Sequence, residues 1–250
     1  MSTTPISAPV ALVTGASRGI GAAIARRLAK DGWAVAVNYA GSAREAAAVV
    51  ADIQQAGGRA FAVQGDVADT ASVRQLFDTV ESTWGRLDLL VNNAGVMPPH
   101  LPHLVDTTDE DFDRLVSINL RGSFNTMREA GRRLKAGGRI LNLSSSLVGT
   151  ALPGYAVYAG TKAAVELMTS ILAKELRGRQ ITVNAIAPGP TATALFLDGK
   201  TPELVERLAK AAPLERLGQP EDIANAVAMF ASADSAWVNG QTLRLNGGLV

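Results

Sequence analysis

The sequence predicts an α/β protein built on a doubly wound parallel sheet with helices on both faces. Short apolar runs alternate with longer helical stretches along the 250 residues, which is typical of repeated strand–helix units. The apolar runs are nearly continuous, as in strands that are buried on both faces. No Pro- or Ser-rich linker interrupts the alternation. We therefore expect a single Rossmann-type domain over residues 1–250, with ligands bound outside the carboxyl ends of the strands.

The first strand–helix unit shows how the elements are marked. The apolar run VALV, residues 10–13, predicts a strand, and the alanine-rich stretch 20–30 predicts a helix that ends at Gly32. Further strands are expected over residues 34–38, 60–64, 87–92, 139–144, 181–186 and 241–245, and further helices over residues 43–56, 71–84, 109–135, 155–176 and 220–231. Residues 97–108 and 188–202 have no predicted element and, as long loops at the ligand end, are expected to serve function.

The composition argues against several kinds of function. Lys and Arg total 24 against 23 Asp and Glu, so the net charge is +1 and there is no basic excess for a nucleic-acid surface. Hydrophobic residues make up 47% and charged residues 19%, which suffices for a core and argues against disorder. The absence of cysteine excludes disulfides, thiolate metal sites and cysteine nucleophiles.

The N-terminal residues carry no sign of export. Residues 1–15 lack a charged segment followed by a long apolar stretch. No apolar run elsewhere approaches the length needed to cross a bilayer. We expect a cytoplasmic protein with no membrane partner.

Residues 14–21, TGASRGIG, connect the first strand to the first helix. Gly15, Gly19 and Gly21 allow a tight turn and let backbone N–H groups approach a pyrophosphate at the helix N-terminus, where the helix dipole favours an anion. The spacing is not G-x-G-x-x-G, and an ordinary strand-to-helix turn is the alternative interpretation. The position after the first strand favours dinucleotide binding.

The end of the second strand indicates which nucleotide binds. Enzymes that use NAD place an Asp or Glu there, about twenty residues beyond the glycines, to bind the ribose hydroxyls. This chain has Asn38 and Ser42 instead, and no carboxylate before Glu45. Because a 2′-phosphate would not be repelled and either Arg18 or Arg44 could pair with it, the pattern favours NADP(H) over NAD(H).

Tyr158 and Lys162 lie four residues apart at the start of a predicted helix, so they share one helix face. A nearby ammonium stabilises a phenolate, and we expect Lys162 to lower the pKa of the Tyr158 phenol toward a range useful for proton transfer. An aromatic ring packed on an aliphatic stem is the alternative. Three serines, residues 144–146, follow the strand 139–144 at the ligand end of the sheet, where they could instead serve as turn or capping residues.

Taken together, these motifs resemble the short-chain dehydrogenase/reductase family over nearly the whole chain. The matching segments, in their expected order, are Thr14-Gly-x-x-x-Gly19-x-Gly21, Asp66-Val67, Asn92-Asn93-Ala94-Gly95, Asn119, Tyr158-x-x-x-Lys162 and Pro188-Gly189. The family's catalytic serine lies thirteen residues before the tyrosine and three after the strand asparagine, here Asn142. Both spacings select Ser145, with Ser146 as a less favoured substitute.

The resemblance implies roles for these residues. Tyr158 is expected to be the general acid of reduction and base of oxidation, Ser145 to bind the carbonyl oxygen, Lys162 to hold the nicotinamide ribose, and Asn119 to support a water that relays protons. The cofactor is expected to contact Gly15, Ser17, Arg18, Gly19, Ile20, Gly21, Asn38, Ser42, Asp66, Val67, Asn92, Ala94, Gly95, Tyr158, Lys162, Pro188, Gly189, Thr191 and Thr193. A homotetramer, or a homodimer, is also implied.

Three functions are weighed. The first is an NADPH-dependent carbonyl reductase, because residues 37–41 and 221–224 resemble 3-oxoacyl-carrier-protein reductases and related ketoreductases. The second is an NAD(P)-dependent sugar or secondary-alcohol dehydrogenase. The third, a nucleotide-binding sensor without catalysis, predicts a broken Ser/Tyr/Lys set, and here the set is complete. The apolar stretch within residues 188–202 suggests a lid over a hydrophobic pocket, which favours acyl or aromatic ketones over sugars.

Three further features of the sequence bear on partners, metals and catalysis. A carrier protein would need a basic patch, which Arg121, Arg128, Arg132 and Arg133 could form, although the family commonly uses that helix for subunit packing. His100 and His103 lie among prolines with no cysteine nearby, and no metal site is expected there. Asn246 stands where Asp is common in the family, and nothing catalytic is inferred from it.

Overall fold

The computed structural model describes residues 6–98 and 100–250 of the chain. Residues 1–5, part of the segment interpreted above as lacking an export signal, lie outside the described residues. Seven strands form one parallel sheet in the order β3-β2-β1-β4-β5-β6-β7, which confirms the predicted fold class. The strands are β1 (Val10–Val13), β2 (Ala34–Tyr39), β3 (Arg59–Gln64), β4 (Leu89–Asn92), β5 (Arg139–Leu143), β6 (Thr182–Pro188) and β7 (Thr242–Leu245).

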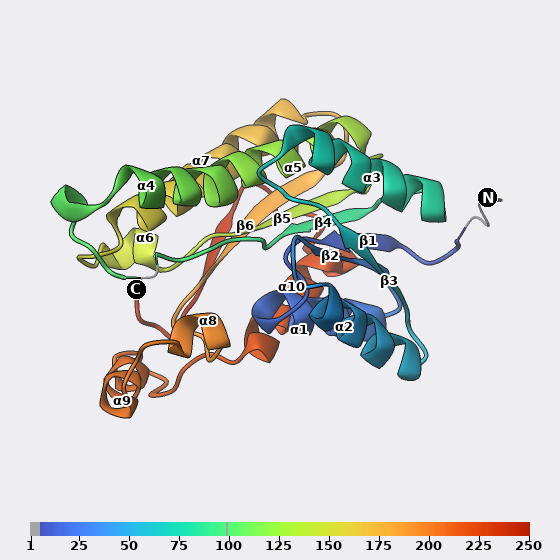
Figure 1. Ribbon diagram of the computed structural model, residues 1–250. Coiled ribbons are helices and arrows are strands. Elements are labelled where there is room, and N and C mark those ends of the chain that lie inside the picture. The colour runs from blue at the N-terminus through green and yellow to red at the C-terminus, as the bar shows by residue number, and fades with distance from the viewer. Residues whose placement is uncertain (1–5, 99) are drawn as a thin grey trace.

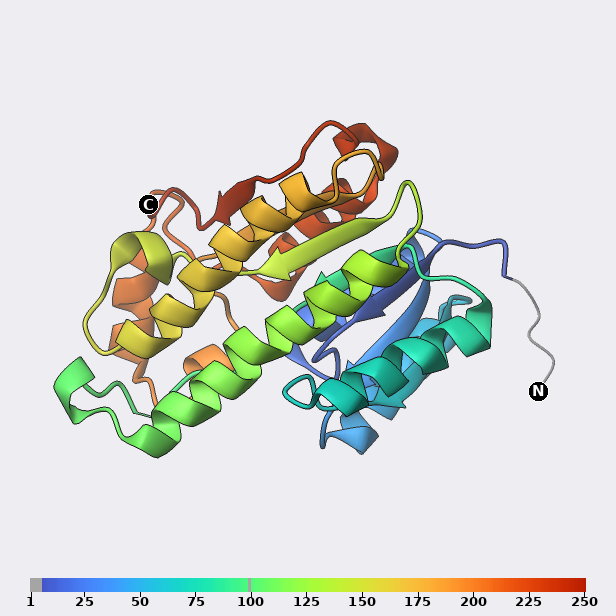
Figure 2. The ribbon, with the colours of Figure 1, turned by 90° about the horizontal axis from the view of Figure 1, so that it is seen from above.

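Helices cover both faces of the sheet (Figure 1). The long helices are α1 (Gly19–Lys30), α2 (Ala43–Gln55), α3 (Thr70–Trp84), α5 (Gly122–Arg133), α7 (Ala156–Glu175) and α10 (Pro220–Ala231). Figure 1 shows α1, α2 and α10 below the sheet and α3, α5 and α7 above it, and Figure 2 shows the upper layer from above. This is the doubly wound arrangement that the alternating pattern predicts.

The two faces of the sheet supply two separate hydrophobic cores. In β1, Ala11 and Val13 belong to the cluster formed with α1, α2 and α10, whereas Val10 and Leu12 belong to the cluster formed with α3, α5 and α7. All four side chains are fully buried. Because successive side chains of a strand point to opposite faces, a strand covered on both sides must be apolar at every position.

The helix expected over residues 109–135 is interrupted. It consists of α4 (Asp109–Leu115), a π-helical segment Val116–Arg121, and α5. The wide segment carries Asn119, whose side-chain amide bonds the backbone of Val96: Oδ1 accepts from its N–H at 2.8 Å, and Nδ2 donates to its carbonyl at 2.9 Å. Single π-helical turns frequently mark functional sites, and this one fixes the loop after β4.

Three short helices lie in stretches that the sequence pattern left without an element. They are α6 (Leu147–Thr150), α8 (Ala194–Leu197) and α9 (Pro202–Lys210). The start of α9 carries a recognisable signal, since Thr201 accepts a hydrogen bond from the Leu204 N–H and Pro202 occupies the first turn. Loop 188–202 is therefore partly helical and leads into a helix at the ligand end.

Candidate active site

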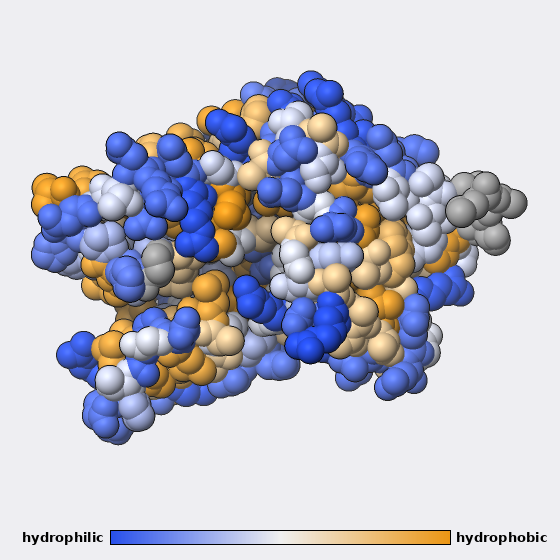
Figure 3. Space-filling model, viewed as in Figure 1, coloured by the Kyte–Doolittle hydropathy of each residue, from blue (hydrophilic) through white to orange (hydrophobic). Residues whose placement is uncertain are grey.

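A cavity of about 760 Å³ opens at the carboxyl ends of the strands. Its wall includes residues from the loops after β1, β2, β3, β4, β5 and β6, together with side chains of α4, α7, α8 and α9. Figure 3 shows the molecule hollowed between the part that contains α4 and the part that contains α8 and α9. The site thus lies where a doubly wound sheet places its ligands.

The glycine loop is close-packed against the loop after β4. Gly15 has a φ of +60°, and a Cβ there would lie 2.8 Å from Ala94 Cα. A Cβ on Gly21 would lie 2.5 Å from the Gly15 carbonyl oxygen. These positions therefore require glycine, and they leave the backbone at the start of α1 bare on the cavity side.

A hydrogen-bond network joins the same two loops. The hydroxyl of Thr14 accepts hydrogen bonds from the backbone N–H groups of Asn93 and Ala94, both at 3.0 Å. The side-chain amide of Asn93 donates to the carbonyl oxygens of Thr14 and Gly15 at 2.9 and 3.1 Å. The bare glycine backbone, the start of α1 and Arg18 on the same wall fit a dinucleotide with its phosphates at the helix N-terminus.

Nearly all of the expected site residues come together on this cavity. The lining includes Gly15, Ser17, Arg18, Gly19, Ile20, Gly21, Asn38, Ser42, Asp66, Val67, Ala94, Gly95, Ser145, Tyr158, Lys162, Pro188, Gly189, Thr191 and Thr193. Asn92 and Asn119 are not in it. Asn92 points away, with Nδ2 donating to the Ser123 carbonyl and the Asn142 side chain, each at 3.3 Å. Its neighbour Asn93 lines the cavity instead.

Asn38 belongs to the wall, but its side chain is committed to the protein. Its Oδ1 accepts from the Gly15 N–H at 3.2 Å, and its Nδ2 donates to the carbonyls of Val63 and Gly65 at 3.3 and 3.0 Å. With only 1% of the residue exposed, this amide holds three backbone segments in place and is not free for a ligand. A cofactor contact at Asn38 stays a prediction, and its side chain supports the glycine loop.

The structure distinguishes the two arginines, Arg18 and Arg44, that could pair with a 2′-phosphate. Arg18 lines the cavity at the start of α1. Arg44 does not line it: its side chain is 94% exposed and pairs with Glu45 at 3.4 Å. Of the two cations that the sequence offered for a 2′-phosphate, only Arg18 faces the cavity.

Tyr158, Lys162 and Ser145 meet on the cavity wall beyond the carboxyl end of β5. Tyr158 and Lys162 lie on successive turns of α7, with Lys162 Nζ 5.8 Å from the centroid of the Tyr158 ring. Lys162 Nζ donates to the carbonyl oxygen of Leu143, the last residue of β5, at 2.9 Å. The Ser145 hydroxyl follows that strand and accepts from the Leu147 N–H at 3.2 Å.

Burial sets the protonation of the Tyr158 and Lys162 side chains. It raises the pKa of the Tyr158 phenol to about 12, while a hydrogen bond with Ser145 acts in the opposite direction. It also lowers the pKa of the Lys162 ammonium to about 8. The expected lowering of the Tyr158 pKa by Lys162 is not found: desolvation of the phenol raises the pKa, and the contact that lowers it is the hydrogen bond with Ser145.

Several cavity residues had no role in the sequence prediction. Tyr155, one turn before Tyr158, and Leu249, near the C-terminus, both line the cavity, as do Arg114 of α4 and Arg207 of α9. Asn246, which was assigned no role, donates from Nδ2 to the Ser146 hydroxyl at 3.0 Å. None of these residues belongs to a spacing motif, and only the folded chain brings them to the site.

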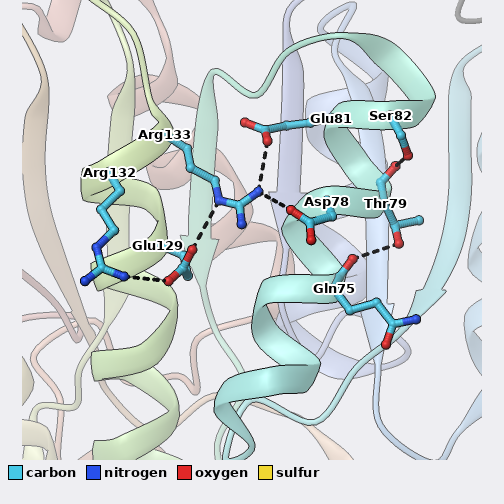
Figure 4. Close-up of polar contacts among 8 residues, drawn as sticks. All are labelled: Gln75, Asp78, Thr79, Glu81, Ser82, Glu129, Arg132 and Arg133. Carbon is cyan, nitrogen blue, oxygen red and sulfur yellow. Dashed lines mark hydrogen bonds and ion pairs between the residues drawn. The ribbon is translucent and has the colours of Figure 1, made fainter.

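Two of the four arginines of the basic patch considered for a carrier protein are paired with carboxylates (Figure 4). Arg133 pairs with Asp78 and Glu81 of α3 at 2.6 and 2.9 Å and with Glu129 at 3.2 Å. Arg132 pairs with the other oxygen of Glu129 at 3.2 Å. The pairs of Arg133 with Asp78 and Glu81 join α5 to α3, so this guanidinium is committed to the protein. The Arg132 pair lies within α5.

Over residues 6–98 and 100–250 the protein offers neither a metal-binding cluster nor a membrane-spanning helix. No group of three or more His, Cys, Asp and Glu side chains is placed to hold a metal ion in this part of the chain. No helix among these residues combines the length and apolar character that a bilayer span requires.

Comparisons with known proteins agree with this geometry. A family model described as Enoyl-(Acyl carrier protein) reductase matches residues 15–250. A Short-chain type dehydrogenase/reductase of Picea abies is 48% identical over 249 residues, covering 96% of this chain and 92% of the relative. An NADPH-dependent aldehyde reductase-like protein, chloroplastic, of Arabidopsis thaliana is 45% identical over 258 residues, covering 98% and 96%. A crystal structure of a short chain dehydrogenase from Burkholderia cenocepacia in complex with NADP superposes with a TM-score of 0.90 at 40% identity, covering 96% of this chain and 97% of that one.

The fold, the cavity and these relatives define the class of protein. It is a Rossmann-type oxidoreductase that acts on CH–OH or C=O groups, with a Ser/Tyr/Lys set at the ligand end of the sheet. The family follows from the extent of the matches. The chain belongs to the short-chain dehydrogenase/reductase family, as the sequence motifs indicated.

Proposed function

We propose that the protein is an NADPH-dependent carbonyl reductase that converts a ketone, an aldehyde or a 3-oxoacyl group to an alcohol. The observation that carries the proposal is the placement of Tyr158, Ser145 and Lys162 together on one cavity wall. Burial raises the pKa of the Tyr158 phenol to about 12. At neutral pH this phenol holds its proton, and reduction needs a proton donor whereas oxidation needs a base. The relatives named as an NADPH-dependent aldehyde reductase and as a complex with NADP support the choice of cofactor.

In this proposal each residue has one task. NADPH supplies a hydride to the carbonyl carbon when it is bound. Ser145 donates a hydrogen bond to the carbonyl oxygen, and Tyr158 transfers its proton to that oxygen as negative charge develops there, which leaves an alcohol and a phenolate. Lys162, buried and charged below about pH 8, holds the nicotinamide ribose beside Tyr158 and stabilises the phenolate.

The cofactor end of the cavity is assigned in the same way. The glycine loop and the start of α1 hold the pyrophosphate, and Arg18 pairs with the 2′-phosphate. Asp66 and Val67 flank the adenine, and Pro188, Gly189, Thr191 and Thr193 surround the nicotinamide and the phosphates. Asn119 acts through Val96, whose backbone it holds, and a water relay from Asn119 stays a prediction.

The decisive variant is Tyr158→Phe, which keeps the ring and removes the proton. We expect kcat for NADPH-dependent reduction to fall roughly a hundred- to ten-thousand-fold, as for loss of a general acid. NADPH binding, followed by its fluorescence, should be retained. Tyr155→Phe removes the neighbouring phenol and should change kcat far less. Normal turnover by Tyr158→Phe would refute the mechanism.

The alternative is an NAD(P)-dependent sugar or secondary-alcohol dehydrogenase. The exposed and half-buried apolar side chains on the substrate wall, including Leu152, Leu195 and Phe196, favour apolar carbonyl compounds over sugars. Initial rates with NADPH and NADH in both directions, on a panel of ketones, β-ketoesters and sugars, distinguish the two.

Assembly and location are part of the proposal. A homotetramer, or a homodimer, is supported by apolar side chains exposed on α5 and α7: Phe124 at 45%, Leu167 at 63% and Ile171 at 44%. Patches of this kind commonly mark interfaces. A cytoplasmic location stays a prediction, and the Arabidopsis relative is named chloroplastic.

A further inference from the structure

The charged side chains on the cavity wall are strongly unbalanced. Among the described residues that line it, Arg18, Arg114, Lys162 and Arg207 are basic, and Asp66 is the one acidic residue. Arg18 and Lys162 are assigned above to the cofactor. Arg114 and Arg207 have no task in the proposed reaction.

Arg114 lies at the substrate end. It belongs to α4, and its neighbours on that helix, Asp111 and Leu115, line a small cavity together with Tyr155 and Tyr158. One turn further on, Ile118 lines the main cavity. Arg114 is therefore held on the side of the cavity where Tyr158 lies.

Arg207 reaches the cavity from the other side. Its helix, α9, also contributes Leu208. Figure 1 shows α4 and α9 apart from each other, α4 at the upper left and α9 at the lower left, and Figure 3 shows the molecule hollowed between these parts. Ala212, directly beyond this helix, lies 3.3 Å from where a Cβ on Gly247 would be. The adjacent Asn246 bonds Ser146, so this end of α9 adjoins the segment that carries Ser145.

Neither guanidinium has a hydrogen bond or an ion pair with another described residue, whereas Arg133 and Arg216 are fully paired. Single unpaired arginines are common on protein surfaces. These two line one concave site from opposite walls, and neither is paired with the carboxylates of its own helix, such as Asp111 and Glu203. They therefore concentrate positive potential where the substrate enters. The wall also carries several apolar side chains, namely Leu147, Leu152, Phe196 and Leu249.

We propose that the carbonyl substrate has an apolar body and an anionic oxygen group, a carboxylate or a phosphate, which Arg114 and Arg207 bind. Guanidiniums match both groups, since each presents two oxygens to the planar donors. The inference rests on the proposed reductase function and adds the substrate class to it. Both arginines are specificity-determining residues, since the reacting atoms lie at Tyr158 and Ser145.

The test compares three aldehydes with NADPH: 4-formylbenzoate, 4-formylphenyl phosphate and the neutral methyl 4-formylbenzoate. We expect kcat/KM for at least one anion to exceed that of the ester about tenfold at low ionic strength, and the ratio to fall with added salt. The anion with the larger ratio of kcat/KM to that of the ester, the carboxylate or the phosphate, identifies the group that the site prefers. The Arg114→Gln, Arg207→Gln double variant should bring the ratio close to one. Arg177→Gln, an exposed arginine outside the cavity, should leave it unchanged.

The outcomes separate this inference from the proposed function. Reduction of the ester with neither anion preferred, or a preference that survives in the double variant, overturns the inference and leaves the reductase function standing. If no aldehyde is reduced, the reductase function fails for this substrate class. The anion site is then tested by calorimetry, which measures the binding of 4-(hydroxymethyl)benzoate and of its methyl ester to the NADP⁺ complex. Tighter binding of the anion that is lost in the double variant supports the site, and equal binding refutes it.

Discussion

The side-chain amide of Asn246 donates to the Ser146 hydroxyl across 3.0 Å, which ties the C-terminal segment to the residue next to Ser145. The Ser146 hydroxyl in turn donates to the Ala187 carbonyl at 3.0 Å. A second bond from the same Nδ2 reaches the Val250 carbonyl at 3.0 Å. Because Leu249 lines the cavity, this network fixes one wall of the substrate site.

Asn246→Asp tests that network. A carboxylate cannot donate to Ser146 or Val250, and turning the Ser146 hydroxyl toward it would abandon the Ala187 carbonyl. We expect the free energy of unfolding, measured in urea, to fall by about 1 kcal/mol. This is at the lower end of the cost of removing a buried hydrogen-bond partner, because Asn246 is half-buried. KM for an apolar ketone should rise more than kcat falls.

The control is a double-mutant cycle with Ser146→Ala. If the two residues act through one bond, Ser146→Ala costs clearly less in the Asn246→Asp protein than in the wild type. Equal costs in the two proteins would mean that Asn246 supports the site by another route.

The sequence could predict the parts of the site that follow the strand–helix pattern. The glycine loop, Arg18 and the pair Tyr158 and Lys162 stand at element boundaries, and a boundary fixes where a side chain emerges. Counting from two directions selected Ser145, and the structure places it on the cavity wall.

The rest depended on contacts that no spacing encodes. Adjacent residues at a strand end point in opposite directions, so the pair of asparagines at residues 92–93 gave no means of choosing the one that faces the cavity. The side-chain amides of Asn38 and Asn119 could bind a ligand, but in the structure they form hydrogen bonds with backbone groups. Arg114, Arg207 and Leu249 come from segments far apart in the chain, which the fold alone brings together.

Arg18→Gln should change which nucleotide the protein prefers. Arg18 is the one of the two candidate arginines that faces the cavity, and the end of β2 offers no carboxylate for free ribose hydroxyls. Loss of a charge-assisted hydrogen bond to phosphate should raise KM for NADPH roughly ten- to a hundredfold and leave KM for NADH almost unchanged. Steady-state kinetics with both nucleotides measures this.

Arg44→Gln is the matched control, since it removes the same charge from a side chain that is 94% exposed and pairs only with Glu45. It should leave the NADPH-to-NADH preference as it is. A preference that shifts in Arg44→Gln and not in Arg18→Gln would reverse the assignment of the 2′-phosphate partner.

Lys162 should make NADPH binding depend on pH. Burial lowers its pKa to about 8, so in the free protein it is charged below that pH and neutral above it. NADPH is a polyanion and favours the ammonium, so binding raises the Lys162 pKa and takes up a proton wherever the free protein has lost one. Affinity should therefore be nearly constant between about pH 7 and 8 and fall above about pH 8.

Calorimetry in two buffers with different ionisation enthalpies counts that proton directly. We expect uptake of most of one proton at about pH 8.5 and almost none at about pH 7, because free Lys162 is largely neutral at the higher pH and charged at the lower. Lys162→Met, which keeps the length of the side chain without the amine, should abolish the uptake, whereas Arg18→Gln should weaken binding and keep it. Equal uptake by Lys162→Met and the wild type would assign the proton to another group and remove Lys162 from the cofactor site.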